Sequence, residues 1–322
     1  MSLNLDPKWS VRSGPLNPRR RQPFARGLGL VEVVVIVAVV SFLVLCILIV
    51  LPKGRETSRM AGCQRNLMQI GVAVQLYEQA NRHYPTTPHF DAPMGGDSTV
   101  LAMLKALTLP DFLDLRDPTQ PPKPSEAPGR GARVAGLTCP SDANAGSGSF
   151  LTALSYRSNV GDGFDAKDGP FSPGILVTPA NVEAANGLSY TAGFAERLVG
   201  TGRDGEPGPM NYAVVPGPLT GPCGKLGDGS RWRGDAGSSW ADSGWRSTFY
   251  SHAVAPNPPT SCLAEDGKTA SMTASSPHPG RLNVLMIDGS LRGVTPTIDL
   301  SVWKAMGSTR PAPTSTTVEP GR

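Results

Sequence analysis

His278 and Asp288 are the two residues whose types could do chemistry together, because an imidazole beside a carboxylate can bind a metal ion or transfer a proton. Asp288 follows His278 by ten positions, which corresponds to about 33 Å in a straight strand at roughly 3.3 Å per residue. They therefore do not meet unless His278 lies in a loop that folds back. The spacing favours separate roles: Asp288 and Gly289 form a hairpin turn, and His278 hydrogen-bonds near the start of the strand.

The other histidines and the serines match no known catalytic or metal-binding pattern. His83, His89 and His252 lie far apart in the sequence and lack the HExxH spacing of zinc enzymes. There is no GxSxG sequence, which marks the nucleophilic serine of many hydrolases. We therefore expect a protein that is not an enzyme.

Two loop clusters could bind a ligand instead. One contains three aspartates among glycines, whose oxygens could hold calcium although the spacing is not that of an EF-hand: Asp162, Asp165 and Asp168. The other contains three tryptophans, whose rings could stack on a sugar: Trp232, Trp240 and Trp245. Structural roles are commoner for both, so we expect solvated turn aspartates and tryptophans that form a core or its cover.

The cysteines are compatible with disulfides, which an oxidising compartment would permit. Cys46 lies in an apolar run, and four cysteines follow that run: Cys63, Cys139, Cys223 and Cys262. An even number is compatible with two disulfides, with free buried thiols as the alternative. Four cysteines allow three connectivities, between which the sequence does not choose. No CxxC pair is present, which argues against a zinc site, and we expect no metal or other cofactor.

Glu32 lies near the start of an apolar run that extends to Leu51. Because about twenty helical residues cross the hydrocarbon core, residues 30–51 are long enough to be a transmembrane helix. A carboxylate in hydrocarbon costs several kcal/mol unless something neutralises it. The basic residues before the run predict a cytoplasmic N-terminus and an exported C-terminal part. The alternative is an ordinary signal anchor that tolerates one glutamate near the interface.

The net charge of +4 comes from the region before this run, since residues 1–27 contain six basic residues and one acid. The remaining chain is therefore slightly acidic. A nucleic-acid partner does not follow from the overall charge, and we expect none.

A long helix positions these features, followed by a loop-rich domain. Apolar residues recur at alternating intervals of three and four from Met60 to Tyr77, which predicts an amphipathic helix that continues the membrane half and ends near Pro85. A break at Pro52 is the alternative. Short strands between glycines and prolines follow, with a Pro-rich linker at 116–133.

The C-terminal part predicts a hairpin, with strands at 282–287 and 290–294, and then a short helix at 299–306. We therefore predict an α+β fold, in which the long helix packs on an antiparallel sheet that includes this hairpin. The expected organisation is a basic leader (1–27), a helix (28–84), an exported domain (85–306) and a disordered tail (307–322).

Residues Arg26 to Glu32 resemble the prepilin-type cleavage and methylation segment. The resemblance implies that a prepilin peptidase cuts after Gly27, that Leu28 becomes the methylated N-terminus, and that Glu32 is the fifth mature residue. In that family the glutamate compensates the N-terminal amine of a neighbouring subunit. The sequence departs from the pattern at Leu28, where an aromatic residue is usual, and at Gly29, where a hydroxyl residue is usual.

Further motifs resemble those of DUF1559-type proteins, in family order: residues 63–71, 137–142, 155–159 and 187–196, and a His-x9-Asp-Gly signature at His278, Asp288 and Gly289. The family resembles type II pseudopilins and type IV pilins in its N-terminal helix alone. The resemblance implies a single-pass protein of the bacterial inner membrane, with its C-terminal domain in the periplasm or at the cell surface. Its expected partners are the membrane, the prepilin peptidase and like subunits, and its expected role is structural or binding. The alternative is a membrane-tethered enzyme, or a calcium- or carbohydrate-binding protein, that does not form filaments.

Overall fold

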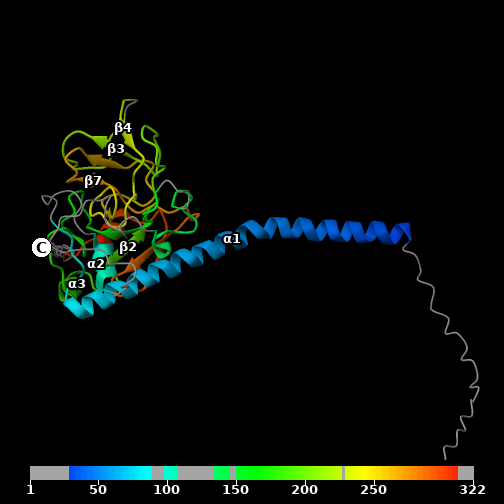
Figure 1. Ribbon diagram of the computed structural model, residues 1–322, viewed down its shortest axis with the longest axis horizontal. Coiled ribbons are helices and arrows are strands. Elements are labelled where there is room, and N and C mark those ends of the chain that lie inside the picture. The colour runs from blue at the N-terminus through cyan, green and yellow to red at the C-terminus, as the bar shows by residue number, and fades with distance from the viewer. Residues whose placement is uncertain (1–28, 89–97, 107–132, 146–149, 227–228, 311–322) are drawn as a thin grey trace, which may run out of the picture. The chain divides into compact units, whose positions relative to one another are not determined.

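The computed structural model describes residues 29–88, 98–106, 133–145, 150–226 and 229–310 (Figure 1). The predicted leader, with Gly27 and Leu28, lies outside these residues, as do His89, residues 116–132 of the linker and the tail beyond residue 310. The chain divides between Pro52 and Lys53 into two compact units.

Helix α1 (Leu30–Asn81) begins in the first unit and is continuous through Pro52, as predicted, so the alternative of a break at Pro52 is wrong. The large apolar side chains of its first half, from Leu30 to Leu45, are exposed in the isolated chain. Within the described part of the chain, no helix meets the length and hydropathy expected of a membrane span. The predicted span also includes residues 46–51, whose side chains lie outside the description.

The second unit contains a five-stranded sheet in the order β5-β1-β2-β8-β9. Its strands are β1 (Tyr156–Asn159), β2 (Ala192–Glu196), β5 (Phe249–Tyr250), β8 (Leu282–Met286) and β9 (Leu291–Val294). All neighbours are antiparallel except β1 and β5, which are parallel. All the residues of β1, β2 and β8 are buried, so this sheet is covered on both faces.

A second, four-stranded sheet has the order β4-β3-β6-β7. Its strands are β3 (Tyr212–Val215), β4 (Arg231–Arg233), β6 (Cys262–Ala264) and β7 (Ala270–Ser271). The pair β3 and β6 is parallel, and the other two pairs are antiparallel. The predicted α+β class is confirmed, although each sheet contains one parallel pair that the sequence did not predict.

Short helices complete the described fold: α2 (Thr99–Ala106), a 3-10 turn η2 (Ala135–Leu137), α3 (Pro179–Ala185) and α4 (Leu300–Gly307). Thr178 and Asn181 form a reciprocal capping box at the start of α3. Asp299 caps α4 by accepting from the amides of Ser301 and Val302. Helix α4 lies where the sequence predicts a short helix.

The second half of α1 contributes a buried stripe to the largest hydrophobic cluster. Cys63, Leu67, Ile70 and Val74 are each at most 5% exposed, at the alternating spacing that an amphipathic helix requires. The same cluster contains sheet residues, among them Leu285 of β8. This stripe places the polar side chains that flank it close to the sheet.

The predicted hairpin forms between β8 and β9. Asp288 Oδ1 accepts from the Ser290 amide at 2.9 Å and from the Ser290 hydroxyl at 2.6 Å. Gly289 adopts a φ of +87°, a conformation that glycine reaches without a steric penalty. Gln75 of α1 donates to the Asp288 carbonyl oxygen at 2.9 Å, which ties the turn to the helix.

Candidate functional site

His278 lies in the loop before β8 and is 2% exposed. Its Nδ1 contacts Glu56 Oε1 of α1 at 2.6 Å. Its Nε2 lies 3.4 Å from Glu196 Oε1 at the end of β2. The imidazole therefore lies between two carboxylates that come from different elements.

Each carboxylate is fixed by further hydrogen bonds. Ser141 Oγ donates to both oxygens of Glu56, at 3.1 and 3.2 Å. Glu196 accepts from the Asn283 amide at 2.9 Å and from Asn283 Nδ2 at 2.8 Å. Gln64 of α1 donates to Asn283 Oδ1 at 3.1 Å. The result is a polar network that joins α1, the turn after Cys139, β2 and β8.

A disulfide adjoins the network. Cys63 of α1 is bonded to Cys139, and Cys223 is bonded to Cys262 of β6. The expectation of two disulfides is confirmed, and the structure selects one of the three connectivities. Cys139 Sγ lies 3.7 Å from His278 Nε2. His278 thus meets a sulfur as well as two carboxylates, but that sulfur is already covalently bonded.

The environment favours a charged His278. Burial alone lowers its pKa, but the hydrogen bonds and negative charges of Glu196 and Glu56 outweigh burial, and the net shift is upward. A protonated imidazole can donate to both carboxylates, one from each nitrogen. The arrangement therefore resembles a partly buried ion-pair network that joins elements, with Glu196 buried and Glu56 about one-third exposed.

Asp288 belongs to a different environment. Burial raises its pKa, but hydrogen bonds from Ser189 and Ser290 and the charge of Arg292 outweigh burial and lower it. Its contacts are those of a turn residue, whereas His278 contacts Glu56 and Glu196. The structure therefore places the two signature residues in separate contact sets.

Asp142, in the same turn as Ser141, is a buried carboxylate with an internal role. It accepts from Ser155 Oγ at 2.9 Å and from the Val199 amide at 3.0 Å, both through Oδ2. Burial raises its pKa, although these hydrogen bonds oppose the shift. Asp142 thus connects the turn to the start of β1 and to the segment after β2.

The other candidate residues are paired with side chains of this same chain or are buried within it. In the aspartate loop, Arg310 lies 3.0 Å from Asp162 and 2.7 Å from Asp168, and Lys167 lies 2.8 Å from Asp165. The rings that could have stacked on a sugar are buried, at 9% exposure or less: Trp232, Trp240 and Trp245. The tryptophan rings are therefore not available to a sugar, whereas the aspartate carboxylates are partly exposed but paired with Arg310 and Lys167.

The remaining described histidines each contact a backbone carbonyl oxygen through Nδ1. His83 Nδ1 lies 2.8 Å from the Tyr84 carbonyl oxygen. His252 is fully buried, where its Nδ1 lies 2.6 Å from the Trp303 carbonyl oxygen and its ring stacks on Trp303. Burial lowers the pKa of His252 to about 3, which keeps it neutral.

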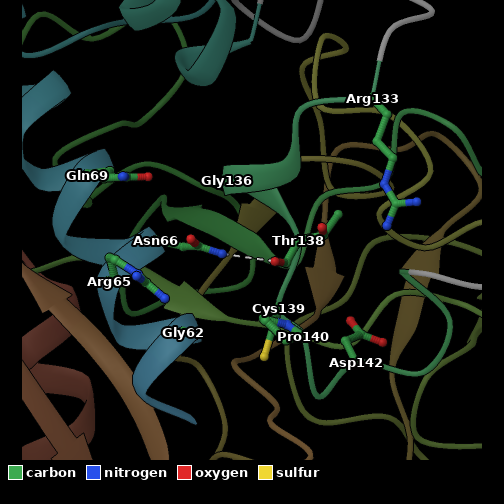
Figure 2. A pocket seen from close by; sticks show the side chains of 10 residues that line it. All are labelled: Gly62, Arg65, Asn66, Gln69, Arg133, Gly136, Thr138, Cys139, Pro140 and Asp142. Carbon is green, nitrogen blue, oxygen red and sulfur yellow. Dashed lines mark hydrogen bonds between the residues drawn. The ribbon is translucent and has the colours of Figure 1, made fainter. Parts of the chain in front are cut away.

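A pocket of about 450 Å³ lies beside Cys139, between α1 and the segment from Arg133 to Asp142. Figure 2 shows Arg65, Asn66 and Gln69 reaching it from α1, with Arg133 on the opposite side. Asn66 Nδ2 donates to the Thr138 carbonyl oxygen at 3.0 Å. The lining combines two guanidinium groups and the side-chain amides of Asn66 and Gln69 with the carboxylate of Asp142, so it is polar and mixed in charge.

Sequence reasoning did not identify Glu56 and Glu196 as partners of His278. Glu56 precedes Cys63 by seven positions, or about two helical turns, so both lie on one face of α1. That spacing was the available signal for Glu56. Glu196 ends one of the quoted motifs, but its convergence with His278 depends on the register between β2 and β8.

A protein-family model described as "Protein of unknown function (DUF1559)" matches residues 52–301. The match includes all the motifs quoted above from residue 63 onward, and it confirms the resemblance that they indicated. Searches among curated proteins and among solved structures give no match.

Proposed function

Because the chain belongs to the DUF1559 family, we propose that it is a membrane-anchored, exported protein of pilin- or pseudopilin-like build, with a structural or binding role. The observation that carries the proposal is the first half of α1, where valine, leucine and isoleucine side chains are exposed all around the helix. Such a surface is stable when lipid or neighbouring helices cover it. Two disulfides in the second unit fit an oxidising compartment on the far side of the membrane.

Glu32 is proposed to neutralise the N-terminal amine of a neighbouring subunit after cleavage behind Gly27. Its Oε2 accepts from the Gly29 amide at 2.9 Å, so the carboxylate lies at the positive end of α1. The free amine of Leu28 in a neighbouring copy would supply the full positive charge that this carboxylate neutralises. The family match begins at residue 52, so this segment lies outside it.

The long helix is proposed to serve as one scaffold from the membrane to the sheet. The Cys63–Cys139 bond, the His278–Glu56 contact and the buried stripe of α1 all support this role. Contacts of three kinds would hold the helix in place while its first half is embedded in lipid.

The environment of His278 supports a non-catalytic role for this network. A hydrolytic site needs a nucleophile that the base can reach and that a substrate can approach. Ser141 donates to Glu56 rather than to His278, and the nearby sulfur is in a disulfide. His278 is also buried.

Mass spectrometry of the mature chain tests the proposal. We expect an N-terminus at methylated Leu28, because cleavage after Gly27 removes the basic leader. Gly27→Ala should abolish processing and leave the leader attached, since the prepilin pattern requires glycine before the cleavage site. Leu28→Phe, which restores the usual aromatic residue, is a matched control that should still be cut. An intact N-terminus at Met1 or Ser2 in the wild type would contradict the prepilin assignment.

A further inference from the structure

Four potential metal ligands converge beside the network. They are the sulfurs of Cys63 and Cys139, the Nε2 atom of His278 and a carboxylate oxygen of Glu196, and these atoms lie within 4.8 Å of one another. All four residues are buried. Zinc sites commonly combine two cysteines with nitrogen or oxygen ligands in a tetrahedron. From this geometry we propose that the chain binds one zinc ion at Cys63, Cys139, His278 and Glu196 when the disulfide is reduced.

The spacing of the ligand atoms suits this ion. Bond lengths of about 2.3 Å to sulfur and about 2.0–2.1 Å to nitrogen or oxygen separate tetrahedral ligand atoms by about 3.3–3.8 Å. His278 Nε2 lies 3.7 Å from Cys139 Sγ and 3.4 Å from Glu196 Oε1. Only small side-chain shifts are needed, chiefly the separation of the two sulfurs once their bond is broken.

The surrounding hydrogen bonds prepare the ligands. Metal-bound histidines usually donate from the other ring nitrogen to a carboxylate, which fixes the ring and its tautomer. Glu56 contacts His278 Nδ1 at 2.6 Å, which leaves Nε2 for the metal. Asn283 likewise orients Glu196 through its amide and its Nδ2. These second contacts already exist without the ion.

The disulfide and the metal exclude each other, because zinc requires both sulfurs as thiolates. A dithiol reductant transfers two electrons and two protons: the S–S bond breaks into two thiols, and the reductant becomes a disulfide. Zinc then displaces both thiol protons, while His278 gives up its second proton and coordinates as a neutral ligand. The bound state therefore holds α1 to Cys139 through the metal in place of the covalent bond.

The other disulfide provides an internal control. Among the described residues, neither Cys223 nor Cys262 belongs to a cluster of three or more potential metal ligands. Reduction of Cys223–Cys262 should therefore create no comparable site. This contrast separates a specific site from general binding of metal by free thiols.

The experiment uses cobalt(II) as a spectroscopic probe for zinc. The full chain in detergent, in a Cys46→Ser background, is reduced with a dithiol, desalted under nitrogen and titrated with cobalt. We expect one equivalent to bind, with thiolate charge-transfer bands and the visible bands of tetrahedral cobalt, and zinc should displace it. The oxidised chain should show neither signal.

Variants locate the site and keep the test decisive. Cys223→Ser with Cys262→Ser should retain the spectrum, whereas Cys63→Ser with Cys139→Ser should lose it. Glu56→Gln should keep the tetrahedral bands but weaken binding about 10–100-fold, as expected for a partner of a ligating histidine.

Thiol counts and circular dichroism verify that each reduced sample has free thiols and remains folded. A folded, reduced Cys46→Ser chain without stoichiometric cobalt binding would overturn the proposal. Equal binding by the Cys63→Ser, Cys139→Ser variant would also overturn it. If reduction in the native state fails, reduction in denaturant followed by refolding with and without zinc gives the same two outcomes.

Discussion

At the residue scale, two buried histidines respond to their surroundings in opposite ways. His278 faces two carboxylates, which raise its pKa despite burial. His252 is surrounded by Tyr250, Trp303 and backbone, where burial lowers its pKa to about 3. The same side-chain type thus favours the protonated form in one place and stays neutral in the core in another.

His252 should make the domain sensitive to acid. Between its unfolded pKa of about 6.5 and its folded pKa of about 3, the unfolded chain binds a proton that the folded chain does not. Stability should therefore fall as pH falls through this window, by roughly 4 kcal/mol at its lower end. His252→Phe, which retains an aromatic ring beside Trp303, should reduce this slope in urea unfolding measured from pH 7 to pH 4. An unchanged slope would contradict a buried neutral His252.

His278 should contribute with the opposite sign. Because its folded pKa is raised, its stabilisation is complete below about pH 6.5 and is lost as pH rises through the folded value. The stability of the wild type, measured against pH, should therefore fall in acid because of His252 and fall at higher pH because of His278. The two losses of stability are distinguishable because one lies below and the other above the ordinary histidine pKa of about 6.5.

At the element scale, α1 approaches the β8–β9 hairpin closely at one glycine. A Cβ added at Gly71 would lie 3.0 Å from Leu285 Cδ1, whereas a Cβ at Gly54 would meet nothing within 4 Å. Both glycines are in α1, so both substitutions gain the same helix propensity. They differ in what the added methyl group contacts.

Gly54→Ala should therefore stabilise the chain by about 0.5–1 kcal/mol, because alanine loses less backbone entropy than glycine in a helix. Gly71→Ala should be less stable than Gly54→Ala by about 1–2 kcal/mol, because Leu285 must move in a close-packed core. Thermal unfolding of the two variants in detergent measures the difference. Equal stabilisation by both would show that α1 does not pack against β8 at this position.

At the scale of the whole molecule, the proposed neighbours are other copies of the same chain. The first half of α1 exposes apolar side chains, and Glu32 is a carboxylate at its start. A carboxylate that neutralises the amine of another copy would bring the two helices side by side. Cys46 lies in the same apolar segment and supplies a natural cross-linking position.

Mild oxidation of membranes should therefore produce a disulfide-linked dimer through Cys46. The dimer should be absent in Cys46→Ser and reduced in Glu32→Gln, because glutamine has a similar shape but no charge to neutralise an amine. Non-reducing electrophoresis measures the dimer. A chain that stays monomeric in the wild type would support a simple anchor and argue against assembly.

The sequence by itself determined the features that depend on local pattern. The intervals from Met60 to Tyr77 predict the amphipathic half of α1, and Asp288-Gly289 predicts the hairpin turn, because helix faces and tight turns are set by residues close in sequence. The number of cysteines was compatible with two disulfides but did not exclude free thiols. The motifs in family order identified DUF1559.

Only the tertiary structure decided which distant residues meet. His278 contacts Glu56, 222 positions away, and Cys63 pairs with Cys139 rather than with either of the other two cysteines. Neither contact follows from spacing, because strand register and the docking of α1 bring these atoms together. The absence of a CxxC pair argued against a zinc site in the sequence. That argument does not detect the cluster of Cys63, Cys139, Glu196 and His278, because ligands that converge only through folding leave no local spacing pattern.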